Sequence, residues 1–139
     1  MSYTKIMVHA VWGTKRRYPF ITKDIRPIII NHIKNNAASK GIYIDTINGY
    51  NDHMHCLMDL NQEYSIGKSI QLLKGESAFW INKEKLTRLK FEWSNEYYAV
   101  SVDAQNISHT RMYIQGQEVH HQNISFQQEY DELMRGFGF

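Results

Sequence analysis

The sequence predicts an α+β fold of the ferredoxin-like, split βαβ kind, in which helices pack on an antiparallel sheet. Three observations predict it. Short runs with alternating apolar and polar residues, typical of half-buried strands, are interspersed with longer runs of helical period. These runs follow one another as β, α, β, β, α, β, α, and a hairpin signal joins the two middle strands. The 139 residues suit one domain that spans positions 1–139.

The first strand is expected within residues 3–13, YTKIMVHAVWG, where apolar and polar positions roughly alternate before Gly13. The first helix is expected over residues 22–41, because isoleucines recur there at helical spacing. Thr22 is its expected cap, and Gly41 is expected to end it.

Residues 42–50 and 52–60 read as the hairpin strands, with turn signals at Asn48-Gly49 and Asn51-Asp52. The later elements are a helix with Ser65 as its cap, a strand, and a third helix that Ser108 is expected to cap. Their expected ranges are 65–83, 96–102 and 107–122.

The composition excludes several classes of protein. Hydrophobic residues at 42%, aromatic residues at 13% and only two prolines indicate a folded globule and not a disordered or fibrous chain. There is no apolar run of about 18 residues and no N-terminal signal pattern. A lone cysteine, Cys56, excludes an internal disulfide and a cysteine-cluster metal site. We therefore expect a soluble intracellular protein.

The charge is distributed unevenly, although the net charge is only +2. Basic residues dominate residues 15–40 and 68–90, and acidic residues dominate from position 91 onward. A basic front would provide a positive surface suited to a nucleic-acid backbone. The alternative is a solvated helix face with ordinary lysines.

Two histidines, His53 and His55, occupy alternate positions of an otherwise apolar strand. Side chains two residues apart share one face of a strand. Neutral imidazoles at that separation are natural ligands of a divalent metal. A phosphate site or an exposed face remain alternatives.

The third predicted helix carries a polar stripe on one face. Gly116 inside this helix costs about 1 kcal/mol relative to alanine, which indicates a bend or a close approach. Taken in isolation, Tyr113 could equally be an amphipathic residue at the edge of the core. The stripe consists of His109, Tyr113, Gln117, His120 and His121.

The His-x-His strand at residues 53–55, followed by the Tyr-x-x-x-Gln spacing of Tyr113 and Gln117, resembles the single-tyrosine HUH transposases of the IS200/IS605 type. The resemblance covers almost the whole chain. VHAVWGTKRRYPF is similar to that family's first strand and basic exit, and SIQLLKGESAFWINK to its Leu-Lys-Gly helix. The region of Phe126, Glu129 and Tyr130 resembles its tail. The fold implied is HUH endonuclease-like.

The resemblance implies a DNA transposase that cleaves and rejoins single strands. Tyr113 would attack a DNA phosphate and form a 5′-phosphotyrosine with a free 3′-hydroxyl. His53, His55 and Gln117 would hold Mg²⁺ or Mn²⁺. From the sequence, His120 or His121 could instead take the place of Gln117, and either of them or His109 could assist as a base.

The implied substrate is single-stranded DNA with hairpins at the element ends, bound by a homodimer in the cytoplasm of a bacterium or archaeon, near the nucleoid. In such dimers the tyrosine helix of one subunit commonly serves the other subunit's histidines. The expected backbone contacts come from Arg16, Arg17, Lys68 and Lys74. Trp12, Trp80 or Tyr18 are candidates for base stacking, with a core position as the alternative for Trp80.

Two other classes of function remain open on the sequence. One is a catalytically silent, domesticated module that binds nucleic-acid hairpins. The other is a small metallohydrolase in which the histidines activate water and Asp52 is the nearest carboxylate. The first would bind DNA without metal or Tyr113, and the second would yield product without a protein–DNA adduct.

Overall fold

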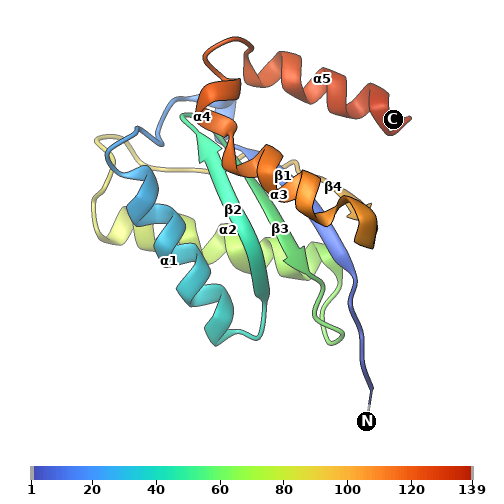
Figure 1. The fold of residues 1–139 in the computed structure, drawn as a ribbon. Helices are drawn as coiled ribbons and strands as arrows, with labels where there is room; N and C mark the ends of the chain where they lie inside the picture. Colours follow the sequence, from blue (N-terminus) through green and yellow to red (C-terminus); the bar gives the residue numbers. More distant parts are fainter. Residues whose placement is uncertain (1, 139) are drawn as a thin grey trace.

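The computed structural model describes residues 2–138, and four strands form one antiparallel sheet in the order β2-β3-β1-β4 (Figure 1). The strands are β1 (Met7–Gly13), β2 (Tyr43–Tyr50), β3 (His53–Asp59) and β4 (Tyr98–Val102). The helices α1 (Arg26–Ser39) and α2 (Ile66–Lys83) connect β1 to β2 and β3 to β4. The two central strands are therefore β1 and β3, and the predicted split βαβ arrangement is confirmed.

Helices cover both faces of this sheet (Figure 1). One face carries α1 and α2, and the other carries the C-terminal helices. These are α3 (Ile107–Gln115), α4 (Gln117–His120) and α5 (Phe126–Gly136). Short 3₁₀ turns lie at residues 15–17 and 104–106. No helix within residues 2–138 has the length and apolar character needed to cross a membrane.

The alternation of side chains along β1 and β3 divides the core into two parts. Residues of even number, such as Trp12 and Met54, join the large cluster under α1 and α2. Residues of odd number, such as Val11 and Leu57, join smaller clusters under α3 and α5. His53 and His55 are odd-numbered, and they point toward the C-terminal helices.

The hairpin turn lies at residues 51–52, so only one of the two predicted turn signals is used. Asn48 and Gly49 belong to β2, and Gly49 pairs with Met54. A Cβ atom at Gly49 would lie 2.2 Å from the carbonyl oxygen of His53. Glycine is needed at this position because β3 approaches closely, not because the chain turns.

One of the three predicted helix caps is confirmed. The Ser65 side chain accepts a hydrogen bond from the backbone N–H of Lys68, as a cap should. The assignment of Thr22 was wrong, because α1 begins after Ile25 with Pro27 in its first turn, where the missing N–H costs nothing. Ser108 lies inside α3, which follows a 3₁₀ turn that Asp103 caps.

The predicted third helix divides at Gly116 into α3 and α4, as its glycine indicated. The helix α5 was not predicted. It begins at Ser125 with a capping box, in which the Ser125 side chain accepts from the Gln128 backbone and the Gln128 side chain from the Ser125 backbone.

Candidate functional site

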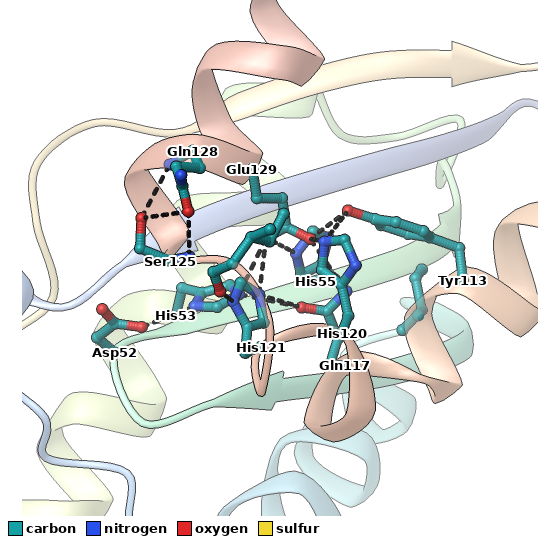
Figure 2. Close-up of polar contacts among 12 residues, drawn as sticks. Asp52, His53, His55, Tyr113, Gln117, His120, His121, Ser125, Gln128 and Glu129 are labelled. Carbon is teal, nitrogen blue, oxygen red and sulfur yellow. Dashed lines mark hydrogen bonds and ion pairs between the residues drawn. The ribbon is translucent and has the colours of Figure 1, made fainter.

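His53 and His55 lie at the centre of a buried polar cluster between β3 and the C-terminal helices (Figure 2). Both imidazoles are fully buried, as is the side chain of Gln117 from α4, and Glu129 from α5 is only 1% exposed. The sheet supplies the histidines and two separate helices supply the oxygen donors.

The donor atoms of these side chains converge on a small volume. Nε2 of His53 lies 3.1 Å from Oε1 of Gln117, and Nε2 of His55 lies 3.0 Å from Oε1 of Glu129. The structure thus brings Gln117 to the histidine pair, as the sequence predicted, and it adds a carboxylate.

The neighbouring histidines at the end of α4 have different surroundings. Nε2 of His121 lies 3.0 Å from Oε1 of Gln117 and 3.1 Å from Oε1 of Glu129. Nε2 of His120 lies on the other side of the carboxylate, 3.2 Å from its Oε2 and 3.5 Å from Oη of Tyr113. His121 therefore joins the donors around His53, and His120 joins the tyrosine.

Tyr113 reaches the cluster from α3 and donates its hydroxyl hydrogen to Oε2 of Glu129 (Figure 2). Its ring meets the His55 ring edge to face, with centroids 5.6 Å apart. Burial and the adjacent Glu129 carboxylate raise the pKa of Tyr113 above its ordinary value. The phenol is therefore neutral in this arrangement.

Glu129 is charged even though it is buried. Burial opposes its ionisation, but hydrogen bonds from His121, His53 and His55 lower the pKa of this carboxyl well below its usual range. A buried carboxylate needs such partners because an unpaired charge in the interior is costly.

The far nitrogens of the strand histidines have partners too. Nδ1 of His53 lies 2.8 Å from Oδ1 of Asp52, and Nδ1 of His55 lies 2.9 Å from Nε2 of His9. Burial lowers the pKa of His9 to about 3 and that of His55 to about 4. For His53, burial also opposes the charge, but the hydrogen bonds to Asp52 and Glu129 outweigh it and raise the pKa.

Polar contacts to β2 fix α3 over the sheet. The amide of Asn48 donates to the carbonyls of Ile114 and Gln115, at 3.1 Å each, where α3 ends. The Arg111 guanidinium donates two hydrogen bonds of 2.8 Å to the Asp45 carboxylate. In this arrangement α3 places Tyr113 beside the histidines of its own chain. The family resemblance led us to expect instead that Tyr113 of one subunit serves the histidines of the other.

The predicted arginines lie beside the site. Arg17 stands over the ring of Phe126, 5.3 Å from its centroid. Arg16 and Arg17 line a cleft of ≈ 200 Å³ that Phe126 and Tyr130 also border. Both arginines have a φ of 56°, a left-handed conformation that is strained for residues other than glycine.

The predicted lysines lie on α2, on the opposite face of the sheet from the histidines. Lys68 is exposed, and the Lys74 ammonium donates to the carbonyl of Ser94 at 2.5 Å. Of the four predicted DNA contacts, the two arginines therefore lie beside the site and the two lysines lie on the other face of the sheet.

The three aromatic residues proposed for base stacking differ in their exposure to solvent. Trp12 is 1% exposed in the core, so the expectation that it stacks on bases was wrong. Trp80 is half-buried and stacks on His32, with centroids 3.8 Å apart. Tyr18 is 47% exposed and remains a candidate.

Sequence reasoning missed the roles of His9 and Glu129 and weighed Asp52 only as a base. His9 occupies an alternate position of the apolar strand β1, which is the same signal that revealed His53 and His55. Glu129 stands with Phe126, Tyr130 and Leu133 at helical spacing, and an acidic residue in an apolar stripe points toward the interior.

Imidazole nitrogens with carboxylate and amide oxygens suit a divalent metal ion. Ligand atoms of His53, His55 and Glu129 lie within 4.8 Å of one another, and Gln117 adjoins them. The donors present therefore fit the metal that the sequence led us to expect.

An antiparallel split βαβ sheet that carries a His-x-His strand under a tyrosine helix defines the class of single-tyrosine HUH proteins. The family model described as "Transposase IS200 like" matches residues 2–117. The chain belongs to this family of transposases.

Particular relatives agree with this assignment. The ISDra2 transposase TnpA of Deinococcus radiodurans is 24% identical over 115 residues, which cover 78% of this chain and 81% of the relative. A crystal structure of a protein assigned as a transposase, from Deinococcus radiodurans R1, has a TM-score of 0.65 at 19% identity and covers 84% of this chain and 93% of its own. A REP-associated tyrosine transposase bound to a REP hairpin has a TM-score of 0.64 at 17% identity, with 87% and 72% covered.

Proposed function

We propose that this transposase cleaves and rejoins single-stranded DNA through Tyr113. The observation that carries the proposal is the shared carboxylate of Glu129, which binds the Tyr113 hydroxyl with one oxygen and His55 with the other, at 3.0 Å. The tyrosine and the histidine pair thus face one reaction centre within a single chain.

In the cleavage step the Tyr113 oxygen forms a bond to the phosphorus, and the bond from phosphorus to the 3′-oxygen breaks. The phenol proton must leave, and it would pass to Oε2 of Glu129, which accepts the Tyr113 hydroxyl hydrogen, and from there to Nε2 of His120 at 3.2 Å. The products are a 5′-phosphotyrosine and a free 3′-hydroxyl. Attack on the phosphotyrosine by another 3′-hydroxyl reverses the step and joins strands without ATP.

His53, His55 and Gln117 are the proposed ligands of a divalent ion, Mg²⁺ or Mn²⁺. When bound, the ion would stabilise negative charge on the phosphate and offset the Glu129 charge beside the phenol. Asp52 and His9 hold the two ligand imidazoles in orientation through their far nitrogens.

The proposed substrate carries hairpins at the element ends, which is supported by the REP hairpin that the similar structure binds. Arg16 and Arg17 would contact the DNA backbone, because their strained turn holds them at the cleft next to Phe126. Lys68 and Lys74 would contact a part of the DNA that extends to the opposite face. The resemblance to the family also supports a homodimer, which sedimentation of the purified protein would test.

The test is a covalent-adduct assay with Mn²⁺ and labelled single-stranded oligonucleotides that tile the DNA flanking the gene. A band of increased mass on a denaturing gel should require metal and disappear in Tyr113→Phe and His53→Ala. Tyr43→Phe is the matched control, because Tyr43 is 63% exposed at the opposite end of β2 from the site. Hairpin binding without any adduct would favour the silent module, and product without adduct would favour a hydrolase.

A further inference from the structure

Five donor atoms, and not only the three of the proposed ligands, lie close together in the site (Figure 2). Besides His53, His55 and Gln117, Nε2 of His121 and Oε1 of Glu129 belong to the group. The separations between neighbouring donors are 3.1 Å for His53–Gln117, 3.2 Å for His53–Glu129, 3.0 Å for His55–Glu129, 3.0 Å for His121–Gln117 and 3.1 Å for His121–Glu129.

These separations match those of ligands around one ion. For metal–ligand bonds of about 2.1 Å, adjacent ligands of an octahedron lie about 3.0 Å apart, and those of a tetrahedron about 3.4 Å apart.

The far nitrogens of His121 and His53 indicate which nitrogen of each ring faces the centre. Nδ1 of His121 lies 2.9 Å from the carbonyl oxygen of Ile124, which can only accept a hydrogen bond. Nδ1 of His53 faces a carboxylate oxygen of Asp52 in the same way, at 2.8 Å. In the neutral tautomers that these partners favour, Nε2 of His53 and of His121 would present a lone pair to a bound ion, in place of the hydrogen bond that each gives Glu129 in the metal-free chain.

The oxygens present lone pairs to the same point. Gln117 donates its Nε2 hydrogen to Oε2 of Glu129 at 3.2 Å, so its Oε1 faces the histidines. Lone pairs of nitrogen and oxygen that face one another are repulsive unless a cation or protons lie between them.

We propose that His121 and Glu129 are ligands of the metal centre together with His53, His55 and Gln117, and that this set selects Mn²⁺ over Mg²⁺. The proposal rests on the metal site of the proposed function and extends it, since both residues lie beyond position 117, where the family match ends.

The selectivity follows from the chemistry of the donors. Mg²⁺ is a hard ion that prefers oxygen and gives up its water reluctantly, whereas imidazole favours first-row transition ions. Three imidazoles and one carboxylate therefore favour Mn²⁺, and the buried Glu129 charge, 1% exposed, strengthens the attraction. The other oxygen of Glu129 accepts from Tyr113, so this ligand also links the nucleophile to the centre.

The test is calorimetric titration of the DNA-free protein with MnCl₂ and with MgCl₂. One Mn²⁺ should bind per chain, about 100-fold more tightly than Mg²⁺. His121→Ala and Glu129→Gln should each weaken Mn²⁺ binding at least about 10-fold. His109→Ala is the control and should leave Mn²⁺ affinity unchanged, because His109 is exposed on α3.

Pulsed EPR of the Mn²⁺ protein provides a second readout. The wild type should show nitrogen couplings from three imidazoles, and His121→Ala from two, with circular dichroism as the check that each variant is folded.

Unchanged affinity and couplings in both His121→Ala and Glu129→Gln, with loss in His53→Ala, would overturn the proposal and leave the proposed function standing. Binding of no Mn²⁺ by the wild type would overturn it as well. The five-ligand pattern without any DNA adduct would support this proposal and reject the proposed cleavage.

Discussion

The Phe126 ring lies flat on the His53 imidazole, with centroids 4.0 Å apart and planes 2° apart. The Arg17 guanidinium also lies over this ring, 5.3 Å from its centroid. Phe126 also packs with Val11 and Tyr98 beneath the first turn of α5. One aromatic side chain thus joins the C-terminal helix, a central histidine and the basic turn.

Replacing Phe126 with leucine should loosen α5. The substitution keeps an apolar side chain but removes the flat contact with His53, and such a change of shape in a packed site costs about 1.5 kcal/mol or less. Urea unfolding should show this loss, and amide hydrogen exchange should increase within residues 126–136. Phe79→Leu is the control, because Phe79 is 68% exposed on α2 and should change stability by no more than about 0.5 kcal/mol. Equal exchange of α5 in both variants would contradict the prediction.

Gly49→Ala should be strongly destabilising. The added Cβ would meet the His53 carbonyl oxygen at 2.2 Å and the Met54 sulfur at 2.8 Å, so the two strands must separate. Overpacking costs about 1–3 kcal/mol, and a backbone contact cannot yield as a side chain does. Gly75→Ala provides the contrast, since its Cβ meets no atom within 4 Å in the interior of α2. That variant should gain about 0.5–1 kcal/mol in thermal or urea unfolding. A tolerated Gly49→Ala would refute the close approach of β3.

The metal-free protein should lose stability as the pH falls from 6.5 toward 4. Burial lowers the pKa of His9 from 6.5 to about 3 and that of His55 from 6.5 to about 4. In this window the unfolded chain binds more protons than the folded chain, so protonation favours unfolding. Near pH 5, His9 alone should lower the free energy of unfolding by about 2 kcal/mol. The raised pKa of His53 acts in the opposite sense, and its contribution is lost as the pH rises above 6.5.

Urea unfolding at a series of pH values checks this expectation. His9→Gln should make the free energy of unfolding depend less steeply on pH between 6.5 and 4, whatever its effect on the overall stability. His109→Gln should keep the wild-type slope, because His109 is exposed on α3. A wild-type curve that is flat across this window would show that His9 and His55 do not titrate as the buried environment requires.

Local patterns predicted the parts of the site that lie on one strand or one helix. The period of two in β3 indicated that His53 and His55 share a face. The spacing of four indicated that Tyr113 and Gln117 share a face of one helix, but the structure divides them between α3 and α4. Glu129 was different, because its role depends on how α5 returns to β3 across 74 residues, and no local pattern encodes that contact. The break at Gly116 was indicated by the glycine, but the Asn48 contacts that hold the end of α3 on β2 come from a residue more than 60 positions away and were not visible in the local pattern.

The basic stretches of the sequence did not predict on which surface each basic side chain lies. Arg17 and Lys68 both belong to basic stretches, and the sequence suggested one positive surface. The fold places Arg17 beside Phe126 and Lys68 on α2, on the other face of the sheet. A run of like charges gives the net charge of a segment but not the direction of each side chain.

Arg17 should therefore contribute more than Lys68 to binding of a single strand at the reaction centre. Arg17→Gln should weaken binding of an unstructured oligonucleotide and reduce the slope of log K against log salt by about 0.7, the value for one phosphate contact on a single strand. Lys68→Gln should leave both quantities unchanged for this short strand. Fluorescence anisotropy at several salt concentrations measures them.

A hairpin-bearing oligonucleotide separates the two faces further. If the hairpin extends to the α2 face, Lys68→Gln should reduce the salt slope for the hairpin substrate alone, whereas Arg17→Gln should reduce it for both substrates. Equal losses from the two variants on the unstructured strand would contradict the prediction, because a short strand at the histidines would then have to contact both faces of the sheet at once.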